Sequence, residues 1–431
     1  MKKARFSQVN AVRGMNDILP SHTALWRKIE KTLTQIFQQY AYHEIRLPIV
    51  EKTELFQRGI GEVTDIVEKE MYTFQDRNHD SLTLRPEGTA SCVRAAIEHG
   101  MLYHQTQKLW YMGPMFRHER PQKGRYRQFY HIGAEAFGFS RYHIEAELIL
   151  MVTRCLDSLN LSEKITLQLN SLGTVASRCQ FREKFVSFCE KNLDKLDEDS
   201  QKRLKTNPLR ILDSKNPDVK MLLQEAPKLN DYLDLASQKE LEQLCQILSD
   251  LNIKYDINPH LVRGLDYYTG IVFEWITPYL GAQSTVCAGG RYDNLVEELG
   301  GSPTPACGFA IGMERLVELY CESQGITTFN EPVDAYFITD ENGIDMAIKA
   351  AEKIKHQIPG IKLELNFLGG SFKSQFKRAD KSQAHFALIV GEDELAQNMV
   401  TLKDLRQGNP QITLSLPKLI EQLTHFFRSL P

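Results

Sequence analysis

Long apolar runs are absent from this sequence of 431 residues. The nearest approach to one is AELILMV at 146–152, and a helix that crosses a bilayer needs about 20 apolar residues. The first residues, MKKAR, are basic, but no apolar stretch follows them, so we expect no secretory signal. These absences favour a cytoplasmic protein that has no membrane partner.

Patterns that pair cysteines or bind metals are also missing. The eight cysteines are scattered, without a CxxC pair and without the Cys/His spacing of a zinc site. Cytoplasmic thiols are kept reduced. We therefore expect reduced, buried cysteines and no dedicated protein site for a metal ion.

The whole chain has no large excess of either charge, since 52 basic residues face 55 acidic ones and the formal net charge is -3. A hydrophobic fraction of 42% and a charged fraction of 25% are typical of a globular protein. The length exceeds what one hydrophobic core usually supports, so it predicts two or three domains.

One segment departs from this balance, namely FRHERPQKGRYRQFYHIGAEAFG at 116–138. Before its aromatic-rich part it carries a single acid, Glu119, and several basic residues. A guanidinium group can bind a phosphate through two parallel hydrogen bonds. A basic loop between two strands therefore suits a triphosphate or the end of a nucleic acid. The alternative is the solvated tip of a hairpin. The basic residues are Arg117, Arg120, Lys123, Arg125 and Arg127.

The first hundred residues predict a helix and two strands. Apolar residues share one face over 20–40, and Ser21 is the expected cap of this helix. The run EIRLPIVE at 44–51 resembles a strand, and Pro48 places it at a strand end or edge, because proline cannot donate to a sheet. This pair suits a subunit interface or ordinary packing on its own sheet. In LTLRPEGT at 82–89, Pro86 and Gly88 end a strand and leave Glu87 and Thr89 beyond it.

Further along, the pattern changes twice. Charged helical stretches dominate 173–254, strand patterns resume at 255, and strands alternate with helices after 325. We predict a core formed by 1–172 and 255–325, a helical insertion at 173–254 and a small α/β domain at 326–431. In that last domain, helical spacing places basic residues on one face, which suits RNA contact or plain solvation. These residues are Lys373, Lys377, Arg378 and Lys381.

Three segments combine glycine with arginine. In ACGFAIGMERLVELY at 306–320, a strand leads into a helix with Arg315 in its first turn, where free amides favour anions. LVRGLDYYTG at 261–270 holds Arg263 and two adjacent tyrosines, which point to opposite faces of a strand. AGGRYDNL at 288–295 places Arg291 in a similar way. The alternatives are a tight strand–helix junction and ordinary core tyrosines.

Taken together, these segments resemble class II aminoacyl-tRNA synthetases and, within that class, the histidyl-tRNA synthetase family, nearly from end to end. The Pro48, 116–138 and 312–315 segments resemble the three motifs of the class. LVRGLDYYTG and AGGRYDNLVEELGG resemble two segments peculiar to the histidine enzymes, and the tail with GGSFKSQFKRADKS resembles an anticodon-binding domain. The implied fold is α+β, with an antiparallel sheet flanked by helices, a helical insertion and a C-terminal α/β anticodon-binding domain.

The resemblance implies a reaction in two steps. L-Histidine attacks the α-phosphate of ATP to give histidyl-adenylate and pyrophosphate, and the terminal 3′-hydroxyl of histidine tRNA then accepts the acyl group. The implied cofactor is Mg²⁺, and the implied assembly is a homodimer in the cytoplasm.

The resemblance also assigns residues to ATP. Arg117 should hold the α-phosphate, Arg125 and Arg315 the γ-phosphate, and Phe129 should stack on adenine. Arg263 should act from the other side of the α-phosphate. The catalytic set implied is thus Arg263 and Arg117, and the ATP-binding set is Arg117, Glu119, Arg125, Phe129 and Arg315.

Other residues are assigned to histidine and to tRNA. Glu87 and Thr89 should bind the α-amino group, and Glu135 with Tyr268 should recognise the imidazole ring. The implied histidine-binding set is Glu87, Thr89, His131, Glu135, Tyr267 and Tyr268. Arg120 and Gln122 should contact the acceptor end of the tRNA.

His131 departs from the family pattern, which has glutamine at this place. Beside a substrate ammonium group it must be neutral to accept a hydrogen bond. We therefore predict that histidine affinity weakens as the pH falls through the pKa of His131.

A second reading is the regulatory subunit of ATP phosphoribosyltransferase, which resembles the same core and binds histidine without catalysis. Such proteins lack the anticodon domain and often lack catalytic arginines, whereas Arg117, Arg263, Arg315 and the tail are present here. A simple RNA-binding module needs neither the glycine-flanked arginines nor the turn at Glu87.

Overall fold

The computed structural model describes residues 8–61, 64–214, 216–281, 284–326 and 331–428. The chain forms two compact units, Met1–Phe329 and Asn330–Pro431. The division lies close to the predicted start of the α/β domain. The predicted limits of the insertion stay a prediction.

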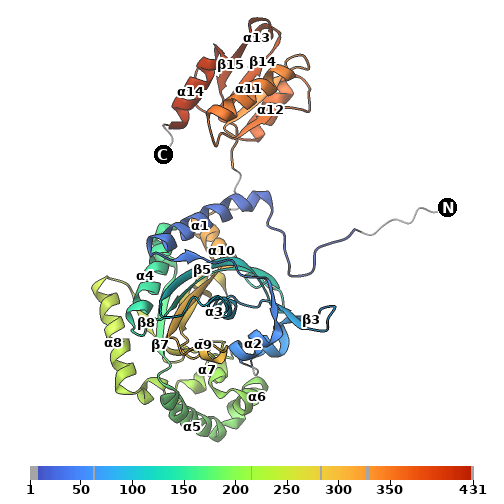
Figure 1. Cartoon of the computed structure of the whole chain (residues 1–431). Helices are drawn as coiled ribbons and strands as arrows, with labels where there is room; N and C mark the ends of the chain where they lie inside the picture. The colour runs from blue at the N-terminus through green and yellow to red at the C-terminus, as the bar shows by residue number, and fades with distance from the viewer. Residues whose placement is uncertain (1–7, 62–63, 215, 282–283, 327–330, 429–431) are drawn as a thin grey trace, which may run out of the picture. The chain divides into compact units, whose positions relative to one another are not determined.

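The first unit is built on a sheet of eight strands in the order β1-β5-β6-β11-β10-β9-β7-β8 (Figure 1). Its central pairs are antiparallel, as predicted, but β1 and β8 each join an edge in parallel. The strands are β1 (His43–Glu44), β5 (Gln107–Phe116), β6 (Gln128–Phe137), β7 (Thr166–Ser171), β8 (Tyr255–Ile257), β9 (Thr269–Ile276), β10 (Thr285–Arg291) and β11 (Ala306–Gly312).

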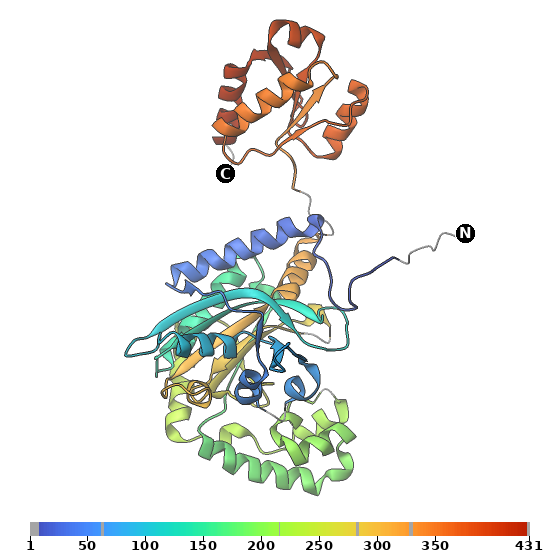
Figure 2. The same ribbon diagram turned by 45° about the vertical axis from the view of Figure 1, so that its right-hand side comes forward.

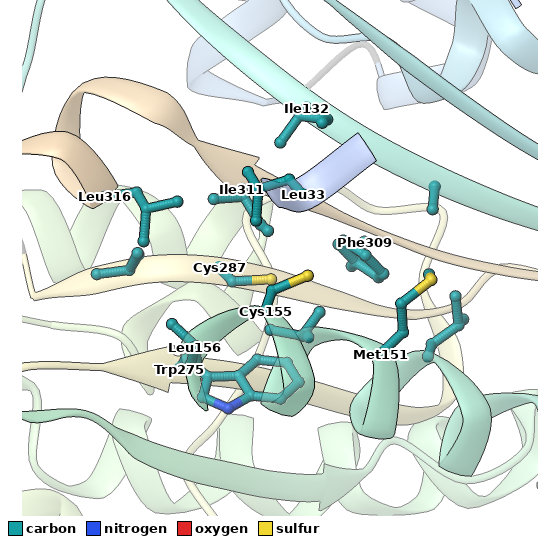
Figure 3. Packing of buried hydrophobic residues seen from close by; sticks show 14 of the residues in the cluster. Leu33, Ile132, Met151, Cys155, Leu156, Trp275, Cys287, Phe309, Ile311 and Leu316 are labelled. Atoms are coloured by element: carbon teal, nitrogen blue, oxygen red, sulfur yellow. The ribbon is translucent and has the colours of Figure 1, made fainter. Parts of the chain in front are cut away.

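Helices cover the outer face of this sheet, and they bury its apolar side chains. In β11, Phe309 and Ile311 point into this core, where Met151 and Leu316 of the covering helices meet them (Figure 3). Gly308, Ala310 and Gly312 alternate with those residues and so face the other side. The covering helices are α1 (Pro20–Gln39), α4 (His143–Ser158), α8 (Leu235–Asp250) and α10 (Met313–Gln324).

The inner face of the sheet curves around α3 (Thr89–Glu98), with α9 (Leu295–Glu298) beside it (Figure 1). A small three-stranded sheet lies next to these helices and is formed by β2 (Val50–Lys52), β3 (Tyr72–Gln75) and β4 (Ser81–Leu84). In the sequence, α2 (Thr53–Ile60) follows β2, and the π-helix η1 (Ile66–Glu70) precedes β3. The glycines and small residues of β11 leave space between the sheet and α3.

The first helix and strand show one prediction that is wrong in detail. Helix α1 forms as predicted, but Leu19 precedes it and no side chain caps it, so Ser21 is not the cap. Pro20 occupies the first helical position, where its fixed φ angle favours the helix without a capping bond. Pro48 lies between β1 and β2, so the predicted strand is broken there into two short pieces.

Residues between β7 and β8 are helical in the described part, in agreement with the predicted insertion. Side chains cap three of these helices, because Thr174, Asp197 and Asp234 each accept from a backbone N–H of the first turn. In Figures 1 and 2, α5, α6 and α7 lie on the side of the sheet away from α1. The helices other than α8 are α5 (Val175–Lys191), α6 (Glu198–Thr206) and α7 (Pro217–Leu223), with short turns η2 (Ser162–Lys164), η3 (Leu193–Lys195), η4 (Pro208–Ile211), η5 (Leu229–Tyr232) and η6 (Pro278–Leu280) nearby in the sequence.

The second unit is an α/β domain with its own sheet in the order β13-β12-β14-β15-β16, as predicted. The first three strands are parallel, and the last two pairs are antiparallel. Its elements are β12 (Ala335–Thr339), α11 (Ile344–Gln357), β13 (Leu363–Leu365), α12 (Phe372–Lys381), β14 (Phe386–Val390), α13 (Glu392–Gln397), β15 (Met399–Asp404), β16 (Ile412–Ser415) and α14 (Leu416–Arg428).

The expected basic face of α12 is only partly exposed. Lys373, Lys377 and Lys381 are exposed, but Arg378 is half-buried and donates to Asn366 and Gly369. Helical spacing therefore predicted the lysines correctly but not the arginine.

The structure also bears on the absence of long apolar runs and on the state of the cysteines. The helices in the described part of the chain include none that is long and apolar enough to cross a membrane. The cysteines are free, and five of them are buried, but Cys179 is exposed and Cys245 and Cys321 are half-buried. The expectation that all are buried is therefore wrong.

Candidate active site

The space between the sheet and α3 is a cavity of about 190 Å³, which we call the central cavity. Its walls come from four distant segments, which are the turn at 87–89, the β5–β6 hairpin, residues 263–268 and the β10–β11–α10 region. Most of the predicted site residues line it. These are Glu87, Thr89, Arg117, Glu119, Arg125, Phe129, His131, Arg263, Tyr267, Tyr268 and Arg315.

Arginines converge on the central cavity from several elements. Arg117 follows β5 and donates through Nε to Pro86 O at 2.9 Å. Arg315, in the first turn of α10, donates to Gly124 O at 2.9 Å and to Thr285 O at 2.7 Å. Burial lowers the pKa of Arg117, and burial followed by repulsion from Arg125 and Arg117 lowers that of Arg315 to about 10. Guanidinium groups that repel one another in a partly dry space favour a polyanionic ligand.

Arg263 approaches the same cavity from the segment before β9. It donates to Glu274 Oε2 at 3.1 Å, and its guanidinium lies 5.6 Å from the ring centre of Tyr268. Both contacts fix the plane of the guanidinium. An arginine held in this way is already oriented when a ligand arrives.

One part of the basic hairpin between β5 and β6 faces the cavity, as a phosphate-binding loop would, and another part is a solvated tip. Gln122 and Arg125 close its tip by two backbone hydrogen bonds of 3.0 and 2.9 Å, and Gly124 has a φ of 69° in the turn. Arg125 forms an ion pair with Glu119 and faces the cavity. Arg120 and Gln122 are exposed and do not line the cavity, so they belong to a solvated tip.

The turn at 87–89 builds the acidic side of the cavity. The carboxylate of Glu87 accepts from the backbone N–H of Thr89 at 2.6 Å and of Ala90 at 2.8 Å, at the start of α3. Burial raises the pKa of Glu87, and these hydrogen bonds oppose the shift. The hydroxyl of Thr89 donates to Glu135 Oε1 at 2.7 Å, so its lone pairs remain for a donor.

Glu135 lies behind the cavity wall, whereas the prediction placed it in direct contact with the ligand. It is 0% exposed, it is not part of the cavity wall, and Thr89, Tyr111 and Tyr292 all donate to it. Burial raises its pKa to about 8. A Cβ atom on Gly308 would lie 1.7 Å from Glu135 Oε2, so only glycine fits beside it. Its role in recognising a ring stays a prediction.

His131 is half-buried in the cavity wall, on β6. Its ring lies edge-on to Phe129 at 5.0 Å, and its Nδ1 is enclosed without a hydrogen-bond partner in the described part of the chain. Burial, followed by the charges of Arg117, Arg315 and Arg85, lowers its pKa to about 3. The side chain is therefore neutral at physiological pH, as a contact with an ammonium group requires.

The residues of the cavity wall that sequence reasoning missed include Tyr111 and Glu314. Tyr111 lies on β5, where nothing in the local pattern marks it, because its partner Glu135 comes from β6. Glu314 accepts from the backbone N–H of Tyr130 at 3.0 Å, and burial raises its pKa to about 7. Its position beside Arg315 in GMER was the available signal.

Arg291 does not face the cavity, so the expectation of a second ligand-facing arginine after a glycine turn is wrong. Its side chain is buried and binds Glu145 at 2.5 and 2.7 Å and Asp293 at 3.1 Å. Glu145 comes from α4, far away in the sequence, and it turns Arg291 into part of the core.

Metal binding by the protein alone has little support in the described residues, which contain no group of three or more His, Cys, Asp or Glu side chains placed to hold an ion. The central cavity does contain two carboxylates near the arginines, Glu119 and Glu314. Mg²⁺ is usually held by one or two carboxylates together with substrate phosphates. These residues therefore fit a Mg²⁺ ion that arrives with a nucleotide.

A largely antiparallel sheet around an arginine-lined cavity, together with a separate α/β unit, defines this chain as a class II aminoacyl-tRNA synthetase-like protein. Residues 14–316 match the family described as "Histidyl-tRNA synthetase", and residues 333–425 match the "Anticodon binding domain" family. The chain belongs to the histidyl-tRNA synthetase family.

Solved structures agree with this assignment. The apo histidyl-tRNA synthetase of S. aureus is 37% identical over 96% of this chain and 100% of its own, with a TM-score of 0.79. The histidyl-tRNA synthetase of Nostoc sp. PCC 7120 shares the fold at 20% identity, 97% and 100% coverage and a TM-score of 0.70. A Bacillus halodurans protein titled "ATP phosphoribosyltransferase regulatory subunit/histidyl-tRNA synthetase" shares it at 21% identity, 90% and 99% coverage and a TM-score of 0.65.

Proposed function

We propose that this protein ligates L-histidine to histidine tRNA in two steps that consume ATP. The observation that supports this most directly is that Arg117, Arg125, Arg263 and Arg315 line one cavity that Glu87 and Thr89 also line. A triphosphate and an amino acid need this combination of cations and an ammonium acceptor.

In the first step, a carboxylate oxygen of histidine forms a bond with the α-phosphorus while the bond to the β-phosphate bridge breaks. Arg117 and Arg263 neutralise the charge on the α-phosphate oxygens, and Arg125 and Arg315 hold the γ-phosphate. Because Arg263 is already oriented by Glu274 and Tyr268, it stabilises the transition state without reorganisation. Phe129 stacks on the adenine, next to Arg117, whose guanidinium lies 5.4 Å from the centre of the Phe129 ring.

In the same cavity, Glu87 and the neutral His131 accept from the α-amino group, and Thr89 assists through its hydroxyl. Tyr267 and Tyr268 border the imidazole, with Glu135 below them. Glu119 and Glu314 would hold a Mg²⁺ ion together with the phosphates, and the ion would supply further charge neutralisation.

In the second step, the 3′-hydroxyl of the terminal adenosine takes the acyl group and AMP leaves. Arg120 and Gln122, at the exposed tip of the hairpin, contact the acceptor end of the tRNA. The C-terminal unit contacts the anticodon.

We also propose a homodimer in the cytoplasm. Val50 and Phe74 are 39% and 45% exposed on the small sheet that follows Pro48, and Ile49, immediately before β2, is 43% exposed. Apolar side chains gathered on one sheet suit a subunit interface.

The experiment that tests the activity is histidine-dependent exchange of labelled pyrophosphate into ATP, followed by charging of histidine tRNA. We expect both reactions. Calorimetric histidine binding without exchange would favour the regulatory reading, with which the Bacillus halodurans title is compatible. Absence of binding and of exchange would reject both readings.

A further inference from the structure

Two apolar side chains stand out on the surface of the C-terminal unit. Phe367 and Leu368 are consecutive residues between β13 and α12, and they are 69% and 82% exposed. The other large apolar residues recorded as exposed in the described part of this unit, Ile348, Leu395 and Ile412, reach only 37%, 37% and 36%. Exposure of this extent at two neighbouring positions requires an explanation.

Hydrogen bonds from Gln375 and Arg378 fix the loop that carries them, so a lack of fixed structure does not explain the exposure. The amide of Gln375, which is 0% exposed, accepts from Thr339 N at 2.9 Å and donates to Thr339 O at 2.7 Å and to Gly370 O at 2.8 Å. Arg378 donates to the side chain of Asn366 at 3.1 Å and to the carbonyl of Gly369. The side chain of Asn366 before Phe367 and the carbonyl groups of Gly369 and Gly370 after Leu368 are therefore fixed.

Two glycines make this loop possible. Gly369 and Gly370 have φ angles of 60° and 92°, which other residues rarely adopt. A Cβ atom on Gly370 would also come within 2.8 Å of Ser374 Oγ. The chain thus turns sharply into α12 and leaves Phe367 and Leu368 at the outside of the turn.

The loop lies where α/β sheets commonly bind ligands. Strands β13, β12 and β14 are parallel, so their carboxyl ends share one edge, and Phe367 follows the end of β13 by two residues. Exposed Lys373 and Lys377 follow in α12. The exposed acids Glu392 and Asp393 follow β14, which lies two positions from β13 in the sheet order.

We infer that Phe367, supported by Leu368, is a stacking platform for an unpaired RNA base, with the neighbouring phosphates against Lys373 and Lys377. An exposed aromatic face beside cations is the combination that binds single-stranded nucleic acid. A rigid loop loses little conformational entropy when a base stacks on it. The identity of this RNA as a tRNA rests on the proposed function.

The test measures binding of unmodified histidine tRNA to the full-length protein by fluorescence anisotropy. Phe367→Ala should raise the dissociation constant about 5- to 150-fold, the range for loss of one base stack. Phe367→Trp should keep the affinity, since indole also stacks. Leu395→Ala, which shortens a less exposed apolar side chain of the same unit, should leave it unchanged. Lys373→Ala should weaken binding and reduce the salt slope by about one.

A second set of measurements identifies the base. Each unpaired base of the anticodon loop is removed in turn, and each abasic tRNA is tested with the native protein and with Phe367→Ala. Removal of the stacked base should weaken binding to the native protein but should not weaken binding to Phe367→Ala any further. The two changes remove the same contact, so their effects on affinity are not additive.

Equal affinity of Phe367→Ala and the native protein would overturn the inference, and so would equal losses in Phe367→Ala and Phe367→Trp. Pyrophosphate exchange needs no tRNA, so we expect it to be unchanged in Phe367→Ala. Absence of exchange in the native protein would instead refute the proposed function, while the tRNA binding measurements would still decide the role of Phe367.

Discussion

Replacement of Glu135 by glutamine should change how the stability of the protein depends on pH. The carboxyl group is completely buried, and hydroxyl groups of Thr89, Tyr111 and Tyr292 surround it. Burial is the largest influence on its pKa, which rises from 4.5 to about 8, and the hydrogen bonds oppose that rise. The folded protein thus retains a proton that the unfolded chain has lost.

The sign and size of the effect follow from linkage. The unfolded carboxyl titrates near 4.5 and the folded one near 8, so the stabilising contribution of the proton is complete below pH 4.5 and is lost as the pH rises to about 8. The folded and unfolded pKa values of Glu135 differ by about 3.5, which at about 1.4 kcal/mol for each pKa unit amounts to about 5 kcal/mol over that interval. Glutamine has the same shape and no titrating proton, so this slope should disappear from the variant.

The assay is the free energy of unfolding by urea, measured from pH 5 to pH 9 for the native protein, Glu135→Gln and Glu225→Gln. Glu225 is an exposed carboxylate, so its variant controls for the loss of one charge. We expect the native protein and the control to lose stability with rising pH relative to Glu135→Gln. Parallel curves for all three proteins would refute a shifted proton on Glu135.

Three further predictions concern the central cavity. Arg263→His should reduce pyrophosphate exchange by roughly 100-fold or more while the circular dichroism spectrum stays native, because it removes an oriented cation from the transition state; retention of exchange would exclude Arg263 from catalysis. The Michaelis constant for histidine should show no His131 titration between pH 5.5 and 8, since the pKa of about 3 moves the predicted loss of affinity far below this range; a pH dependence that His131→Gln abolishes would contradict that pKa. Gly88→Ala should destabilise the protein by about 1–3 kcal/mol, because its methyl group would lie 2.2 Å from Tyr111 Cε2. Gly312→Ala, whose nearest neighbour would be 3.9 Å away, should have no such effect on thermal unfolding.

Short-range patterns predicted much of the fold. Apolar spacing predicted α1, because periodicity reflects which face of an element is buried. Charged helical stretches predicted the helices of 173–254, and alternating patterns predicted the strands and helices after 325. Proline and glycine marked the breaks at Pro48 and Gly88 for the same local reason. The cap at Ser21 failed because proline at the preceding position starts the helix without one.

The site shows the limits of such reasoning more clearly. The sequence indicated Arg117, Arg263 and Arg315 as anion-binding residues, and they do line one cavity. Arg291 also follows a glycine turn in the sequence, but it binds Glu145 of α4 in the core. Nothing local distinguishes these arginines, since the difference lies in a partner 146 residues away.

The sequence by itself determined the elements, the motifs and the family, because each depends on residues close together in the chain. The tertiary structure decided burial and electrostatics. Glu135 is protonated near neutral pH and His131 is neutral because several distant segments remove them from water, and the pKa of a side chain depends on everything that surrounds it. The exposure of Phe367 was likewise decided in three dimensions, by Gln375 and Arg378 holding its loop in place.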